Sequence, residues 1–208
     1  MNTELWTIND SGVLRITPFL LKVCRANAFG SRYLYEGGAV ENALFTYLSG
    51  KPDIDFFEEH RTLFFGRYLV CMNAEWELFL KSSPYLDKIL LRRMFKPFSG
   101  RSIKMLLPLP RGYELCSFDK DAFYEHPFGH GANYTDHSDF LRRGSGAVVR
   151  YGKEIVSSAS GFLTYENEVE MDISTVKEHR RKGLADHCTS MMLEDCASRG
   201  IIVHWDAQ

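Results

Sequence analysis

The sequence contains little cysteine, and its cysteines are neither paired nor clustered. Among 208 residues there are five, Cys24, Cys71, Cys116, Cys188 and Cys196, with no Cys-x-x-Cys pair. An odd number at wide spacing disfavours both a disulfide framework and a thiolate zinc site. We therefore expect free thiols, most of them packed in the interior, as is typical of a protein from a reducing compartment.

The sequence also lacks an excess of charge of either sign and a membrane-spanning run. Its 25 basic and 27 acidic residues leave a formal net charge of -2, which disfavours nucleic-acid binding through bulk positive charge. The N-terminus has no basic signal-peptide region, and the apolar stretch after it is interrupted by Arg15 and Lys22. We expect a cytoplasmic protein with no nucleic-acid partner and no membrane partner.

Hydrophobic residues, at 45% of the chain, suffice for a sizeable core, and the length suggests one large or two small domains. A helix is predicted where apolar residues recur at three- and four-residue steps, at Leu69, Met72, Trp76 and Leu80. Residues 84–95 predict a second helix. The segment 96–102 contains Pro, Gly and Ser and is the best candidate linker. We therefore predict two domains, over residues 1–102 and 103–208.

The C-terminal half combines short strands with one long helix. Three β-type runs joined by short turns predict an antiparallel meander: residues 146–151, 154–165 and 168–175. A helix is predicted over residues 181–199, and Gly200 is placed to end it in a left-handed conformation. The apolar run 201–205 predicts a buried strand, which can return parallel to the third strand through a right-handed crossover. These elements predict an α+β fold with a mixed, mainly antiparallel sheet.

The junction between the third strand and the helix has the pattern Arg-x-x-Gly-x-Ala. Its residues are Arg180, Arg181, Lys182, Gly183, Leu184 and Ala185. The first turn of a helix has unpaired N–H groups and partial positive charge, and a glycine there allows close approach, so the pattern suits a diphosphate. The alternative is a solvated basic face with an incidental glycine. Cations at a helix N-terminus oppose the helix dipole unless an anion binds, which favours the binding site.

Six segments, in this order and at this spacing, resemble one bacterial family of GNAT N-acetyltransferases, which includes the zwittermicin A-resistance acetyltransferase. They are GYEL (112–115), DFLRRGSGAVV (139–149), EIVSSAS (154–160), EVEMDI (168–173), EHRRKGLA (178–185) and HWDA (204–207). The resemblance covers residues 105–208 well and extends more loosely over the N-terminal half, which in the family is a separate α+β domain.

One departure from the family concerns the C-terminus. In the family the last motif is followed by a further helix and closing strands, whereas this sequence stops at Gln208. We therefore expect a partial GNAT core that lacks the final helix and strands. The apolar strand 201–205 would then lie at an open sheet edge, which predicts a possible homodimer through that edge.

The resemblance implies acetyl-CoA as the acyl donor and a small amine-bearing metabolite or antibiotic as the acceptor. The diphosphate would lie on the amides of residues 181–185, next to the cations of Arg180, Arg181 and Lys182. The pantetheine arm would pair with the preceding strand at Ile173, Ser174 and Thr175. The alternative is a catalytically weak or inactive acyl-CoA-binding or interaction protein.

Transfer to an amine requires a base, because an ammonium has a pKa of about 10 and must lose a proton before it attacks. Strand alternation puts Glu168, Glu170 and Asp172 on one face, and their neighbours Val169, Met171 and Ile173 on the other, toward the core. By position along the strand, Glu170 is the first choice for the base, Glu168 the second and Asp172 the third. The alternative is an ordinary solvated strand face.

A metal site is a weaker possibility, in the segment HPFGHGANYTDH. It contains His126, His130, Asp136 and His137. Their spacing matches no familiar zinc pattern, and the Gly- and Pro-containing context is typical of a loop. We therefore expect no metal, and interpret the segment as a lid that contacts the acceptor.

Overall fold

The computed structural model describes part of the chain. The described residues are 3–5, 32–33, 39–41, 45–48, 51–59, 68–71, 74–84, 93–95, 108–125 and 134–207. Two compact units are present: Met1–Asn2 with Phe95–Asp206 (unit 1), and Thr3–Met94 with Ala207–Gln208 (unit 2). The predicted boundary between residues 102 and 103 stays a prediction, because residues 96–107 lie outside the described ranges.

Unit 2 contains a four-stranded sheet of order β2-β3-β4-β5. The strands are β2 (Arg32–Tyr33), β3 (Ala39–Glu41), β4 (Phe45–Leu48) and β5 (Tyr68–Cys71), and the helices are α2 (Ile54–Glu59) and α3 (Ala74–Ser82). Its core is formed by Leu48, Phe57, Trp76 and Leu80. The apolar spacing is correct for the last two of these, which lie on α3.

Two short strands flank this part of the sequence, β1 (Thr3–Leu5) and β6 (Arg93–Phe95). The predicted helix over residues 84–95 is therefore wrong at its C-terminal end, and residues 85–92 lie outside the described ranges. Leu69 likewise belongs to β5, not to the predicted helix. Both errors have one cause, because a short apolar run fits a buried strand as well as a helix.

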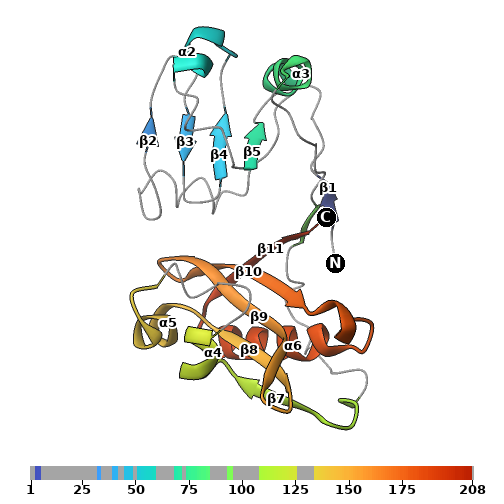
Figure 1. The fold of residues 1–208 in the computed structure, drawn as a ribbon. Helices are drawn as coiled ribbons and strands as arrows, with labels where there is room; N and C mark the ends of the chain where they lie inside the picture. The colour runs from blue at the N-terminus through green and yellow to red at the C-terminus, as the bar shows by residue number, and fades with distance from the viewer. Residues whose placement is uncertain are drawn as a thin grey trace. The chain divides into compact units, whose positions relative to one another are not determined.

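In the described residues of unit 1, five strands form a mainly antiparallel sheet of order β11-β10-β9-β8-β7 (Figure 1). They are β7 (Tyr113–Ser117), β8 (Gly146–Tyr151), β9 (Glu154–Tyr165), β10 (Glu168–Thr175) and β11 (Ile202–Ala207). Strands β7 to β10 pair antiparallel, and β10 pairs parallel with β11. The predicted meander and the parallel return are thus confirmed, and β7 adds an edge strand beside β8. The predicted open edge at strand 201–205 is wrong, because β6 is the second neighbour of β11 in the strand order.

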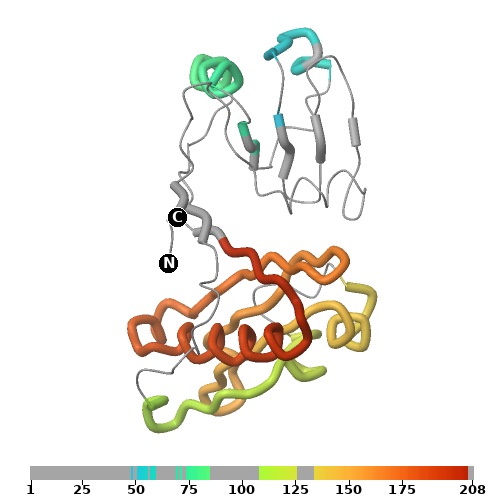
Figure 2. The backbone as a smooth tube through the Cα atoms, turned by 180° about the vertical axis from the view of Figure 1, so that it is seen from behind, coloured from blue at the N-terminus to red at the C-terminus, as the bar shows by residue number. Residues whose placement is uncertain are grey.

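Helices cover both faces of this sheet. Helix α6 (Leu184–Ser198) lies on one face, and α4 (Lys120–Glu125) and α5 (His137–Arg143) lie on the other (Figures 1 and 2). Strand β8 shows how alternation makes two cores, because Ala147 and Val149 pack in the α6 cluster while Val148 packs in the α4–α5 cluster. The sheet is therefore the middle layer of three.

The long helix, predicted over residues 181–199, is shorter by three residues at its start and by one at its end. It begins at Leu184 and not at residue 181, because the three residues before it form a turn in which Gly183 is left-handed, with a φ of 74°. At the other end Gly200 has a φ of 67°, as predicted for a residue that ends a helix.

Strand β9 has an irregularity beside the acidic strand. The register with β10 shifts between Glu170 and Met171, whose partners on β9 are Leu163 and Gly161. The extra residue, Phe162, therefore lies on β9, and β10 keeps its regular alternation. The three acids of β10 consequently share a face, as the sequence predicts.

Candidate active site

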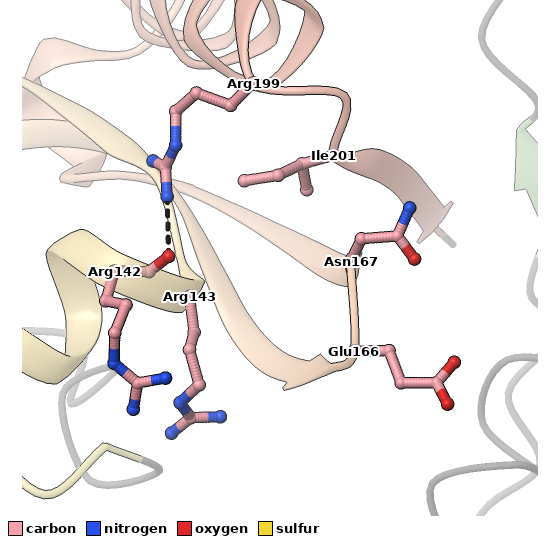
Figure 3. A pocket seen from close by; sticks show the side chains of 6 residues that line it. All are labelled: Arg142, Arg143, Glu166, Asn167, Arg199 and Ile201. Carbon is pink, nitrogen blue, oxygen red and sulfur yellow. Dashed lines mark hydrogen bonds between the residues drawn. The ribbon is translucent and has the colours of Figure 1, made fainter.

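The pocket in Figure 3 lies at the end of the sheet where the turn between β9 and β10 meets the ends of α5 and α6. It is lined by Arg142, Arg143, Glu166, Asn167, Arg199 and Ile201. Its cations are already engaged: Arg142 Nη2 lies 2.6 Å from Asp139 Oδ1, and Arg143 Nε donates to the same oxygen at 2.8 Å. These bonds hold the pKa of Asp139 well below its usual range, with Arg143 as the main cause. We therefore interpret the pocket as a structural contact between α5, α6 and the β9–β10 turn, and not as a ligand-binding site.

The Arg199 side chain links the end of α6 to the end of α5, and its loss should destabilise the protein. Its guanidinium donates to Gly144 O at 2.8 Å and to Leu141 O and Arg142 O, both at 2.9 Å, which are carbonyls at the end of α5. We expect Arg199→Ala to lower the free energy of unfolding by about 1–3 kcal/mol, because these carbonyls lose a charged donor. Urea denaturation measures the change. The control, Arg142→Ala, removes a side chain that is 71% exposed and should cost much less.

The opposite end of β10 leads into the basic turn. After β10 come a 3-10 turn (Lys177–His179), Arg181 with a φ of 59°, and Gly183 in the left-handed conformation without a side-chain cap. Alternating backbone conformations of this kind turn successive N–H groups toward one side and form an anion-binding concavity. A Cβ at Gly183 would meet nothing within 4 Å, so the N-terminus of α6 faces open space. This geometry fits the predicted diphosphate site.

The three cations of the turn have different roles. Arg180 Nε donates to Thr175 O at 2.9 Å, and Lys182 Nζ donates to Tyr113 Oη at 2.7 Å. In the part of the chain that the structure describes, the exposed Arg181 guanidinium makes no hydrogen bond or ion pair. Arg180 and Lys182 thus stabilise the conformation of the turn, and Arg181 is the cation available to a ligand.

Tyr113 and His179, which the sequence analysis did not identify, also support the turn. Tyr113 Oη lies 2.9 Å from His179 Nδ1, and the two rings meet edge to face at 5.7 Å between centroids. Tyr113 begins β7, which lies at the far edge of the sheet from β10. Only the tertiary structure brings it to the turn, so no local sequence pattern could have identified it.

The strand before the turn has a backbone edge that β11 leaves free of pairing. Register partners between β10 and β11 run from Glu168 with Ile202 to Glu170 with His204 and go no further in the described residues. On its other side, β10 pairs with β9 through Thr175. The predicted pantetheine positions, Ile173, Ser174 and Thr175, lie in this stretch, which suits a ligand that extends the sheet.

The acids of β10 lie on the face opposite α6. Val169 and Met171 are buried in the α6 cluster, and Ile173 packs against it, as predicted. Glu170 is only 2% exposed, so the interpretation as a solvated strand face is wrong for this residue. Asp172 is half-buried and accepts a hydrogen bond from Ser174 Oγ at 3.2 Å. Glu170 is therefore a buried carboxylate on β10, the strand that leads to the turn.

His204 is a further site residue that the sequence analysis did not single out. Its Nε2 lies 2.7 Å from Glu168 Oε2, and the side chains are 22% and 17% exposed. Its Cα is the register partner of Glu170 on the neighbouring strand. The predicted parallel return of the last strand could have identified this residue, because it places a histidine of β11 near the acids of β10.

Buried thiols do not provide a nucleophile in this part of the structure. Burial raises the pKa of Cys188 to about 12 and that of Cys196 to about 11. Both thiols therefore stay protonated near neutral pH, and a thiol is a poor nucleophile. The four cysteines that the structure describes are free, as the sequence predicts.

The histidine-containing segment has a structural role where the structure describes it. Asp136 caps α5 by accepting from Asp139 N at 2.8 Å, and His137 Nε2 lies 3.1 Å from Phe118 O. His126 and His130 lie outside the described residues. Within the described ranges, no group of His, Cys, Asp and Glu side chains could hold a metal ion, and no helix is long and apolar enough to cross a bilayer.

Comparison with known families decides what kind of protein carries this turn and sheet. The model of the GNAT acetyltransferase family matches residues 33–208. The chain belongs to the GNAT acetyltransferase family. Its mainly antiparallel sheet, the parallel last pair and the glycine turn at the start of α6 are thus features of a GNAT member.

One curated relative and two solved structures are similar to this GNAT chain. The uncharacterized N-acetyltransferase YdfB of Bacillus subtilis (strain 168) is 30% identical over 135 residues, which is 63% of this chain and 52% of the relative. The chain thus spans about half the length of that protein. A GCN5-related N-acetyltransferase-like protein from Streptococcus suis 89/1591 has a TM-score of 0.70 at 21% identity, with 97% of this chain and 85% of that chain covered. A GCN5-related N-acetyltransferase from Kribbella flavida has a TM-score of 0.56 at 13% identity, with 90% and 84% covered. Both structures are similar in fold.

Proposed function

We propose that this GNAT protein transfers the acetyl group of acetyl-CoA to the amine of a small molecule. The observation that carries the proposal is the continuous arrangement of β10, turn and α6. The turn, which follows β10, presents unpaired amides and Arg181. On β10 itself, the buried Glu170 lies on the face that points away from α6. The proposed anion site follows β10 and the proposed base lies on it, so both requirements of amine acetylation would be met along one strand.

Acetyl-CoA supplies a thioester that can be attacked by a neutral amine, and this chain's residues would bind and orient it. The amides of residues 181–185 and the guanidinium of Arg181 would hold the diphosphate, for which the left-handed Gly183 leaves room. The backbone of Ile173, Ser174 and Thr175 would pair with the amide-containing arm. Holding the amine and the thioester together would supply much of the rate enhancement.

Glu170 is the proposed base. It would accept a proton from the ammonium of the acceptor, and the neutral nitrogen would then attack the thioester carbon. A backbone N–H of the unpaired stretch of β10 would stabilise the negative charge that develops on the carbonyl oxygen. Glu168 and Asp172 remain the second and third choices that the sequence predicts.

Other features of the proposal concern the acceptor and its context. Three features stay predictions: a small amine-bearing metabolite or antibiotic as acceptor, membership of the subfamily with the zwittermicin A-resistance acetyltransferase, and a cytoplasmic location. The homodimer through strand 201–205 is not proposed, because β11 is not an open edge in the strand order. The alternative, an acyl-CoA-binding or interaction protein without catalysis, is not favoured, because the chain matches the acetyltransferase family model over residues 33–208.

Two measurements test the proposed function. Calorimetric titration with acetyl-CoA should show saturable binding, since the turn provides the anion site. A panel of small amines should then release free thiol, measured with a thiol reagent, only when both substrates are present. Binding without thiol release for any amine would support the non-catalytic alternative, and no binding at all would contradict both.

A further inference from the structure

The buried position of Glu170 raises a question about the path of the proton. Acetylation of an ammonium by a thioester gives an amide, a free thiol and one proton that must leave the site, since one of the two protons lost by nitrogen ends on sulfur. Glu170 is 2% exposed, so the proton that it accepts has little direct contact with water. A base in this position needs a neighbour that passes the proton on.

Strand register places His204 beside Glu170. Val169 and Val203 are register partners, and both are buried in the cluster beneath α6. One residue further along, Glu170 and His204 are partners and therefore point to the opposite face together, because side chains alternate along both strands. Adjacent strands are about 4.8 Å apart, so the backbones of Glu170 and His204 are direct neighbours and their side chains leave the sheet side by side on the same face.

The imidazole is held by a second carboxylate and reaches water. Nε2 of His204 is 2.7 Å from Glu168 Oε2, and about a fifth of each side chain is exposed. A carboxylate that bonds one ring nitrogen fixes the orientation of the ring. On the described part of this face, Glu168, Glu170 and Asp172 are the charged groups of β10, and Tyr165 of β9 is the partner of Glu168.

We propose that His204, held by Glu168, relays the proton from Glu170 to water during each turnover. This inference rests on the proposed function and adds two residues with distinct roles to it. Glu170 accepts the proton from the acceptor nitrogen and passes it to the imidazole of His204. His204 releases a proton to water, and both groups return to their starting protonation states, so one proton leaves for each acetyl group transferred. His204 acts through Glu170 and does not contact the acceptor, and Glu168 positions its ring.

The test is chemical rescue of the variant His204→Gln. Glutamine keeps a hydrogen-bonding side chain next to Glu168 but cannot relay a proton. We expect kcat to fall by about 10-fold or more while the Kd for acetyl-CoA stays unchanged. Added imidazole should restore kcat of the variant in a concentration-dependent way and leave the wild-type kcat unchanged. A residue with a merely structural role would not respond to imidazole.

A matched control is Ile202→Gln, which changes an exposed residue of the same strand and should show neither effect. Retention of the full kcat by His204→Gln would overturn the relay, and so would a loss that imidazole fails to restore in a folded variant that still binds acetyl-CoA. If the wild-type protein transfers no acetyl group, the proposed function fails and the relay fails with it. If the wild type transfers acetyl groups and His204→Gln does so equally well, only the relay fails and the proposed function stands. The two failures are therefore distinguishable.

Discussion

Turnover of the Glu170→Gln variant should fall by about 10²–10⁴-fold, while its affinity for acetyl-CoA stays unchanged. The substitution keeps the shape of a side chain that is 2% exposed, and it removes the ability to accept a proton. Because a glutamine adds no volume and no charge to this buried position, the fold should be retained. Steady-state kinetics with thiol detection measure the change, and calorimetry checks the affinity.

The pH dependence adds a second readout for Glu170. The acceptor loses its own proton as the pH approaches the amine pKa of about 10, and a base is then no longer needed. The deficit of Glu170→Gln should therefore shrink as the pH rises. Asp172→Asn is the matched control on the same face and should lose little activity. If Glu170→Gln keeps full turnover and Glu168→Gln loses it, the role of base belongs to Glu168.

Acetyl-CoA affinity of the Gly183→Asp variant should fall by about 10- to 100-fold, which is roughly 1.4–2.8 kcal/mol. A carboxylate at this position would stand where the diphosphate is proposed to lie and would repel it. Neighbouring protein atoms would not be displaced, since a Cβ at Gly183 meets nothing within 4 Å. Calorimetric titration of the wild type and the variant with acetyl-CoA measures the difference.

The other end of α6 offers a matched control for this variant. Gly200 has a φ of 67°, against 74° for Gly183, and a Cβ there also meets nothing within 4 Å. Gly200→Asp therefore has the same left-handed backbone cost, and it places a negative charge at the unfavourable end of the helix dipole. It should be no more stable than Gly183→Asp and yet bind acetyl-CoA normally. Equal affinity of Gly183→Asp and the wild type would contradict the assignment of the turn.

Local patterns determined a large part of the C-terminal unit. The bounds of β8, β9 and β10 match their predicted runs, residues 146–151, 154–165 and 168–175. Alternation and tight turns act between residues that are close in sequence, so they can be recognised without the fold. The Arg-x-x-Gly-x-Ala junction was recognised for the same reason, because its residues are contiguous, but the left-handed conformation of Gly183 was not predicted.

Predictions failed where an apolar run was too short to distinguish helix from strand. Arg93–Phe95 forms a strand within a segment that was predicted to be helical, and Leu69 lies on β5 rather than α3. The start of α6 moved from residue 181 to Leu184, because the turn occupies three residues that continue the helical spacing of the sequence. Spacing alone does not report where the backbone leaves the helix.

Sequence alone thus determined the strand order of the meander, the glycine turn and the shared face of the three acids, since each follows from periodicity over a few residues. The tertiary structure decided which of these acids is buried, that His204 joins them, and that Tyr113 supports the turn with Lys182. These contacts join residues 36 and 69 positions apart in the chain. Contacts over such separations depend on how the strands are ordered and registered in the sheet, which no local pattern encodes.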